Sequence, residues 1–178
     1  GSESRNTTFA TWRGADSDVL LLECLFVTEC AAPPALHADR FLPATPIRVV
    51  VNHAFKNVTG KVDLSEIELV RTRPERLLDQ PSIKNKILPK MLRRAEEIAR
   101  KQSGELAAAA QTAMDTQLQD ELSRLRDLRQ FNDHIREEEI TTLESHREAL
   151  EKALSAPQLR LDALRLIWQR QAQAAGGK

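Results

Sequence analysis

The first 70 residues alternate between short apolar runs and clusters of turn residues. Val19 to Val27 is apolar and partly β-branched, and turn signals bound it, which predicts a buried strand. Asn6 to Trp12 and Ile47 to Val51 are further predicted strands, and Ile67 to Val70 is a weaker strand or a short helix. Lys56 to Lys61 holds an Asn and a Gly and predicts a turn. Together these elements predict a small, mostly antiparallel β-sheet.

The connection between the second and third predicted strands is long. Ala31 to Thr45 spans 15 residues, and Pro33 and Pro34 end the strand that precedes it. Connections of this length without regular structure are uncommon in compact domains. This segment is therefore expected either to pack over the sheet or to carry a contact.

From Pro81 onward the apolar spacing changes to threes and fours, which is the period of an amphipathic helix. One helix of about 45 residues would be roughly 65 Å long at 1.5 Å per residue. Gly104 marks a kink or a break, because glycine within a helix costs about 1 kcal/mol relative to alanine. The run Ala107 to Ala110 would let another element approach closely. The stripe consists of Leu92, Ala95, Ile98 or Ala99, Leu106, Ala109, Ala113, Leu118, Leu122, Leu125 and Leu128.

A second helical stripe follows an interruption at Phe131 to His134. Because only a few residues join the two stripes, they predict an antiparallel hairpin with a coiled-coil-like seam that includes Leu122, Leu125, Leu143 and Leu150. Pro157 either starts a fresh helix, with Ser155 as its cap, or kinks the second helix. The second stripe consists of Ile140, Leu143, Arg147, Leu150, Leu154, Pro157, Leu161, Leu164 and Trp168.

These patterns predict an α+β fold. A small, mostly antiparallel β-sheet is followed by long helices that form the antiparallel hairpin. Residues 1-80 make the β-rich part and residues 81-178 the helical hairpin part, and the two form one composite domain of ordinary size.

Charge modifies this picture, because it is segregated although it sums to zero. Residues 71–101 hold ten basic and four acidic residues, whereas residues 115–151 hold five basic and eleven acidic ones. The basic segment is either a solvated helix face or a surface for an acidic partner or a phosphate backbone. Aromatic residues are 4% of the chain, which argues against a platform of stacked bases. The candidate partner surface consists of Arg71, Arg73, Arg76, Lys90, Arg93 and Arg94.

The sequence lacks the motifs of a catalytic or metal site. Gly60-Lys61 is followed by Val62, and Phe55 stands where a phosphate-binding loop needs its first glycine. Cys24 and Cys30 lie six residues apart on one predicted strand, roughly 20 Å at about 3.3 Å per residue, which is too far for a shared metal or a disulfide. We expect them to be reduced, structural thiols without metal. No apolar run approaches the roughly 20 residues of a membrane-spanning helix, and no signal pattern is present, so we expect a cytoplasmic protein.

Three ordered segments resemble one known family. They are Arg40–Arg48 (RFLPATPIR), Glu121–Leu125 (ELSRL) and Leu159–Ile167 (LRLDALRLI). They resemble the C-terminal region of the bacterial RapA (HepA) family of RNA polymerase-associated proteins, and their order and spacing agree from about Asn6 to Gln169. Where that family has Asn-Pro-Asn-Ile-Arg at the helical turn, this chain has Asn-Asp-His-Ile-Arg at 132–136.

The resemblance implies a part of a larger protein that binds RNA polymerase and promotes its recycling. Members of the family are Swi/Snf-type ATPases, and their ATP and Mg sites lie in two lobes that have no counterpart in this sequence. The fragment is therefore expected to be noncatalytic and to need no cofactor. Its expected role is docking or scaffolding on RNA polymerase core or on the elongation complex, in the bacterial cytoplasm and at the nucleoid through the polymerase. Two alternatives stay open: the basic segment guides RNA or DNA, or the hairpin braces the ATPase lobes. No membrane partner is expected.

Overall fold

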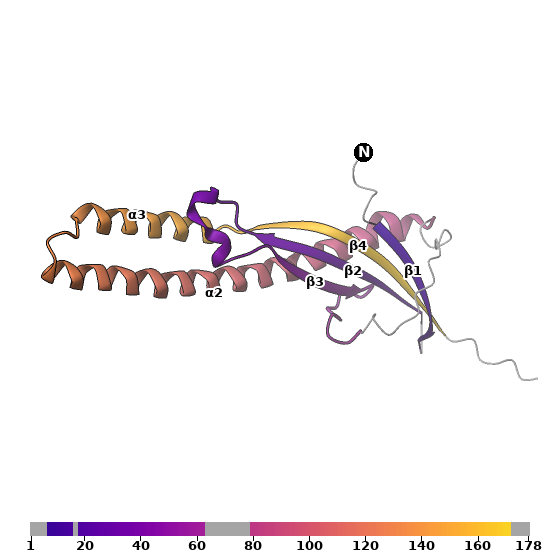
Figure 1. The fold of residues 1–178 in the computed structure, drawn as a ribbon. Coiled ribbons are helices and arrows are strands. Elements are labelled where there is room, and N and C mark those ends of the chain that lie inside the picture. The colour runs from indigo at the N-terminus through magenta and orange to yellow at the C-terminus, as the bar shows by residue number, and fades with distance from the viewer. Residues whose placement is uncertain (1–6, 16–17, 63–78, 172–178) are drawn as a thin grey trace, which may run out of the picture. The chain divides into compact units, whose positions relative to one another are not determined.

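The computed structural model describes residues 7–15, 18–62 and 79–171. The chain divides into two compact units (Figure 1). The sheet unit comprises Gly1–Val27, Pro46–Arg100 and Arg160–Lys178, and the hairpin unit comprises Thr28–Thr45 and Lys101–Leu159. The predicted strand or helix at Ile67 to Val70 lies outside the described residues.

Four strands form one sheet in the order β1-β4-β2-β3. The strands predicted around Val19, Ile47 and Asn6 are confirmed, each with slightly different ends. The remaining strand, β4, runs parallel to β1, with Thr7 opposite Leu164 and Ala15 opposite Gln171. The bounds are β1 (Thr7–Ala15), β2 (Val19–Glu29), β3 (Thr45–Asn52) and β4 (Gln158–Gln171).

The contacts of β2 show that both of its neighbours are antiparallel to it. Glu23 pairs with Arg48 of β3 and with Arg165 of β4. Two residues earlier on β2, Leu21 packs with residues two positions later on the neighbours, Val50 and Ile167. Since the numbers rise on one strand and fall on the others, these pairs are antiparallel. The predicted α+β fold with a mostly antiparallel sheet is confirmed, and the β1–β4 pair is its parallel exception.

The prediction that helix continues to Trp168 is wrong. The second helix ends at Leu154, and after Pro157 the chain enters strand β4. Leu, Ala, Arg and Gln favour helices locally, but β4 lies between β1 and β2, and its ladder hydrogen bonds override that preference. Pro157 therefore neither kinks a helix nor starts one. It stands one residue before a strand, where its missing N–H costs the ladder nothing.

The sheet is buried on both faces at its centre. On one face the side chains of Leu20, Leu22, Cys24 and Phe26 of β2 are buried, and Val49 of β3 is buried too. The first long helix runs alongside the sheet within this unit (Figure 1). Its buried stripe consists of Met91, Ala95 and Ala99.

A second apolar cluster covers the other face of the sheet. It consists of Leu21, Val50 and Ile167, and Val58 and Val62 of the turn after β3 pack against it. The predicted turn at Lys56 to Lys61 thus covers part of this face. Apolar cover on both faces explains why β2 and the second half of β3 read as nearly continuous apolar runs.

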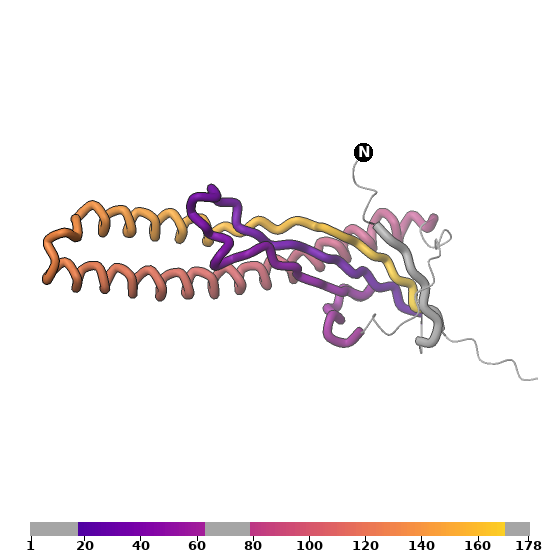
Figure 2. Tube along the Cα trace, in the orientation of Figure 1, coloured from indigo at the N-terminus to yellow at the C-terminus, as the bar shows by residue number. Residues whose placement is uncertain are grey.

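A short π-helical segment, η3 (Ile83–Ile87), precedes the long helix α2 (Leu88–Phe131). Pro89 accounts for the wider turn, because proline has no N–H for a hydrogen bond to the carbonyl of residue 85 and its ring clashes with that carbonyl. Helix α2 is continuous over 44 residues, so Gly104 marks no break (Figure 2). The neighbouring Ser103 is buried and shares a 2.6 Å hydrogen bond with the hydroxyl of Thr28.

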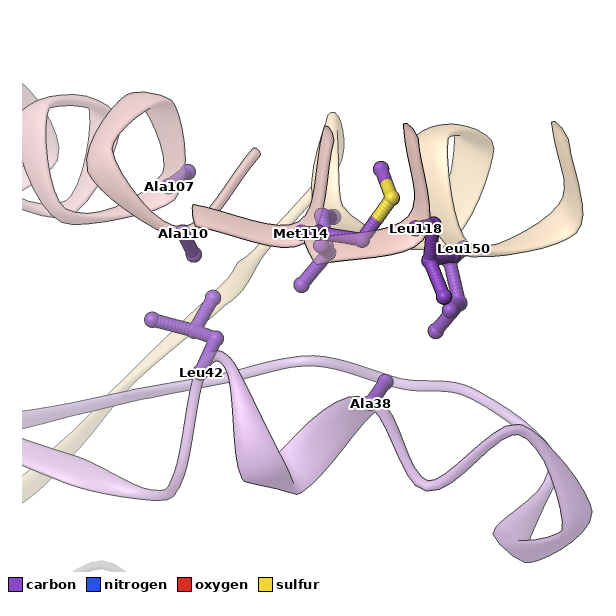
Figure 3. Packing of buried hydrophobic residues seen from close by; sticks show 8 residues of the cluster. Ala38, Leu42, Ala107, Ala110, Met114, Leu118 and Leu150 are labelled. Atoms are coloured by element: carbon purple, nitrogen blue, oxygen red, sulfur yellow. The ribbon is translucent and has the colours of Figure 1, made fainter. Parts of the chain in front are cut away.

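In the hairpin unit, α2 and α3 (Glu137–Leu154) pair as an antiparallel hairpin. The long connection after β2 contains two 3-10 turns, η1 (Pro34–Leu36) and η2 (Ala38–Arg40). It packs against the hairpin, where both turns contact α3. Leu42 lies beside the small residues Ala107 and Ala110 of α2, and Ala38 lies further along, near Leu118 and Leu150 (Figure 3). The small side chains of the alanine run therefore allow another segment to pack closely against α2, as predicted.

Candidate docking surfaces

The seam of the hairpin holds the candidate surfaces of this unit in place. Leu122 and Leu150 of the predicted seam are buried, whereas Leu125 and Leu143 are half-buried. Toward the end of the hairpin the seam opens into a groove of about 630 Å³ between the helices. The prediction is thus confirmed for the inner leucines, and the two outer ones line a groove. The groove is lined by Glu121, Leu125, Arg136, Glu138, Glu139, Thr142, Leu143 and His146.

Ion pairs across the hairpin reinforce the seam. Arg147 Nε and Nη2 lie 2.8 and 2.6 Å from one carboxylate oxygen of Asp115, and the pairing raises the pKa of Arg147. Arg126 pairs with Glu144 at 2.5 Å. Arg129 pairs with Glu137 beside the connection between the helices. The order of these partners along α2 and α3 is that of an antiparallel pair.

The predicted basic surface is described in part. Lys90, Arg93 and Arg94 are exposed on the first turns of α2, whereas Arg71, Arg73 and Arg76 lie outside the described residues. Residues 90, 93, 94, 97 and 100 recur at helical spacing, on the side of α2 opposite its buried stripe. We call the exposed cations of this part of the chain the α2 basic surface: Lys84, Lys86, Lys90, Arg93, Arg94 and Arg100.

Arg94 is the member of the α2 basic surface that the fold positions. Its Nε donates a 3.3 Å hydrogen bond to the carbonyl oxygen of Phe55, in the turn after β3. Its Nη1 lies 3.1 Å from Glu97, one turn along the helix. Exposed pairs of this kind contribute about 0.2–1 kcal/mol. The single carboxylate of Glu97 does not neutralise the six cations, so the surface stays strongly positive. Lys84, Lys86 and Arg100 were not part of the surface predicted from the sequence.

The end of the hairpin carries a surface of opposite character. Phe131 is 90% exposed and Leu128 is 46% exposed. The predicted apolar stripe included Leu128, but the helical phase drifts along α2, so that its side chain points away from the buried seam. An open groove of about 460 Å³ lies on this face of α2. Its lining residues are Asp120, Ser123, Arg124, Asp127, Leu128 and Phe131.

The two thiols occupy different environments. Cys24 is fully buried, and burial, followed by the charges of Glu23 and Glu96, raises its pKa to about 12. The Cys30 thiol donates a 3.1 Å hydrogen bond to the carbonyl oxygen of Ala153, and partial burial raises its pKa. Both groups are thiols, not thiolates, at neutral pH. The part of the chain that the structure describes contains no group of three His, Cys, Asp or Glu side chains suited to a metal ion.

A charge cluster that the sequence pattern did not indicate crosses three strands. The two carboxylate oxygens of Glu23 on β2 bind the Nε of Arg48 at 2.8 Å and the Nε of Arg165 at 2.9 Å. Glu23 is 16% exposed, and the guanidinium groups are about one third exposed. One acid and two bases, distant in sequence, thus fix the alignment of β3, β2 and β4. Only the strand register reveals this cluster.

Comparisons with known proteins place the chain in a family. Residues 1–169 match the family described as "RNA polymerase recycling family C-terminal". The chain is 35% identical over 151 residues to RNA polymerase-associated protein RapA of Pectobacterium carotovorum, and 35% identical over 150 residues to the protein of that name from Klebsiella pneumoniae. Each alignment covers 83% of this chain and 16% of the relative. The chain thus spans about one sixth of the length of these relatives.

The described helices include none with the length and apolarity needed to cross a bilayer. The family match runs through both compact units, from the N-terminal strand to β4. All three segments on which the resemblance was based lie inside it. The chain therefore belongs to the C-terminal RNA polymerase recycling family and corresponds to the C-terminal region of RapA.

Proposed function

We propose that this chain is a noncatalytic docking domain of a RapA-like transcription ATPase. It binds RNA polymerase core and thereby helps the parent protein to promote recycling of the polymerase. The observation that carries this proposal is the match to the RNA polymerase recycling family across residues 1–169. The relatives are named as polymerase-associated proteins, and no phosphate-binding loop occurs in this sequence.

The α2 basic surface is the proposed contact. Its α2 cations lie on the exposed side of a helix whose other side is anchored by Met91, Ala95 and Ala99, and Lys84 and Lys86 precede them in η3. A helix fixed in this way presents long cationic side chains without a large ordering cost for the backbone. Four like charges on one face of α2, at Lys90, Arg93, Arg94 and Arg100, repel one another, so an acidic partner surface gains from offsetting them.

Direct contact with nucleic acid is the second candidate function, and the same row of cations favours it. Lys and Arg on one helix face are the usual contacts to phosphate oxygens. The two functions differ in their dependence on salt. Phosphate contacts on duplex DNA give a slope of about −0.9 per neutralised phosphate in a plot of log affinity against log salt. Charge pairs between proteins act mainly through the association rate.

The test measures binding of the fluorescently labelled chain to purified bacterial RNA polymerase core, with and without added RNA, over a series of salt concentrations. We expect binding to the core without nucleic acid. The double variant Arg93→Glu/Arg94→Glu should weaken it by about tenfold or more, since a tenfold change needs only about 1.4 kcal/mol. The matched control reverses two exposed lysines outside the surface, Lys61→Glu/Lys152→Glu, and should bind like the wild type.

The fold of both variants is checked by thermal unfolding. Arg94 loses only exposed contacts, so its replacement should shift the unfolding temperature little. Equal binding by the Arg93/Arg94 variant and the wild type would refute the assigned surface. Binding that requires RNA, with a steep salt slope, would favour the nucleic-acid function instead.

A further inference from the structure

We propose that the end of the helical hairpin is a second docking site, which inserts Phe131 and Leu128 into an apolar pocket rimmed by Lys and Arg on a protein subunit of the polymerase core. This inference rests on the proposed function for the identity of the partner. It assigns a separate contact surface, on the hairpin unit rather than on the sheet unit. We call it the hairpin-end surface: Asp120, Arg124, Asp127, Leu128 and Phe131.

The hairpin-end surface exposes two large apolar side chains, Leu128 and Phe131, that do not pack in the core of the hairpin. Along α2 its residues recur at threes and fours, on the side away from the buried Leu118 and Leu122. Phe131 at 90% exposure and Leu128 at 46% therefore contribute little to the hairpin seam. Adjacent large apolar side chains beside a groove of about 460 Å³ are typical of interaction sites, in which aromatic residues often provide most of the binding energy.

Charge indicates the chemistry of the partner. Residues 115–151 hold eleven acids and five arginines. Arg126, Arg129 and Arg147 are engaged in pairs across the hairpin, each with one acid. This leaves two arginines against eight acids, so the segment presents a negative field. Such a field repels a phosphate backbone and attracts a protein surface rich in Lys and Arg.

The groove between α2 and α3 offers places for the basic rim of the partner. Glu121, Glu138 and Glu139 line this groove of about 630 Å³. The half-buried Leu125 and Leu143 lie in the same groove. Lys and Arg can lay their apolar stems along such leucines while their charged ends meet carboxylates. The two grooves thus provide an apolar anchor site and an acidic flank on the same end of one hairpin.

The hairpin-end surface is held rigidly enough to act as an anchor. Leu118, Leu122 and Leu150 are buried along the seam, and the Arg126–Glu144 pair joins the helices near the end. A surface that is already ordered loses little conformational freedom when it binds. Removal of the apolar anchor should therefore act mainly on the dissociation rate.

The experiment compares three variants of the full chain for binding to purified RNA polymerase core in the absence of nucleic acid. Leu128→Ser/Phe131→Ser removes the apolar anchor, and Asp120→Lys/Asp127→Lys reverses its acidic neighbours. The matched control is Leu106→Ser, which replaces a leucine of α2 with 36% exposure outside the hairpin-end surface. Circular dichroism verifies that all three keep the helical content of the wild type.

We expect the dissociation constant to rise at least tenfold for the Leu128/Phe131 variant, through faster dissociation. The Asp120/Asp127 variant should also bind at least tenfold more weakly, through slower association at low salt. Leu106→Ser should match the wild type. Photocrosslinking from a benzoylphenylalanine placed at position 131 should label a peptide of a polymerase subunit that contains both apolar and basic residues.

The outcomes separate this inference from the proposed function. If the wild-type chain fails to bind the core, both are overturned. If it binds, and the reversal of Arg93 and Arg94 weakens binding whereas the Leu128/Phe131 variant does not, the hairpin-end surface is refuted and the proposed function stands. If the Leu128/Phe131 variant loses affinity for RNA or DNA instead of for the core, the assignment to a protein partner is wrong.

Discussion

Replacement of Leu150 by alanine tests the packing of the hairpin unit most sharply. Leu150 is fully buried, and it packs in one cluster with Met114, Leu118 and Leu154. Figure 3 shows Leu150 beside Leu118. The cluster also includes Leu42 of the connection after β2. A cavity at position 150 would thus weaken two contacts at once, the pairing of α2 with α3 and the attachment of the connection.

The expected loss follows from the degree of burial. Truncation of a fully buried leucine costs about 2–5 kcal/mol, which includes the lost transfer free energy and the cavity that remains. Alanine favours helices slightly more than leucine does, by a few tenths of a kcal/mol, and offsets little of this. We therefore expect a destabilisation of about 3 kcal/mol. Leu128→Ala is the matched control, since this leucine is 46% exposed and its truncation should cost no more than about 0.5 kcal/mol.

Urea unfolding, followed by the helical ellipticity at 222 nm, measures both variants. With a denaturant dependence of about 2 kcal/mol per molar urea, Leu150→Ala should lower the midpoint by about 1.5 M. Leu128→Ala should leave the midpoint nearly unchanged. Equal midpoints for the two variants, or a loss at Leu150 below about 0.5 kcal/mol, would mean that Leu150 does not lie in the packed seam of the hairpin.

Two further predictions concern the sheet unit. Replacement of Glu23 by Gln leaves Arg48 and Arg165 facing each other without their shared acid, and should destabilise the protein by about 1–3 kcal/mol. This loss of stability should shrink in 1 M salt, and a loss independent of salt would contradict the electrostatic explanation. As a control, Glu97→Gln on the exposed helix face should change the stability very little. Cys24, with a pKa raised to about 12 by burial, should resist iodoacetamide at pH 8 in the folded protein and react fully in urea. Because its pKa is higher folded than unfolded, stability should fall as the pH rises from about 9 to 12, and Cys24→Ala should remove this part of the fall; rapid native-state alkylation would show that the thiol is accessible.

Local pattern was sufficient for a strand with a continuous apolar run and for helices whose two sides differ. The apolar run at Val19 to Val27 predicted β2, and the spacing of leucines predicted both helices and their antiparallel pairing. It was insufficient for β4. Leu164 and Trp168 are half-buried on one face of that strand, and Ile167 is buried on the other. A strand covered on both faces shows no alternation, and its leucines at positions 161 and 164 imitate a helical stripe.

The candidate surfaces were predictable to different degrees. Lys90, Arg93 and Arg94 of α2 were evident from charge segregation, because exposed cations on a helix need no partner in the fold. The hairpin-end surface was not, since Leu128 continues the apolar stripe in sequence and only the packing shows that it leaves the seam. The cluster of Glu23 with Arg48 and Arg165 depends on strand register across 142 positions of sequence, which no local pattern encodes.

Sedimentation of this chain with a stoichiometric amount of purified RNA polymerase core, free of nucleic acid, tests the central claim most directly. A docking domain that contacts the polymerase through its own surfaces should sediment with the core enzyme, and the Arg93→Glu/Arg94→Glu variant should remain behind. A wild-type chain that sediments alone, or that joins the polymerase only when RNA or DNA is added, would contradict the proposed function.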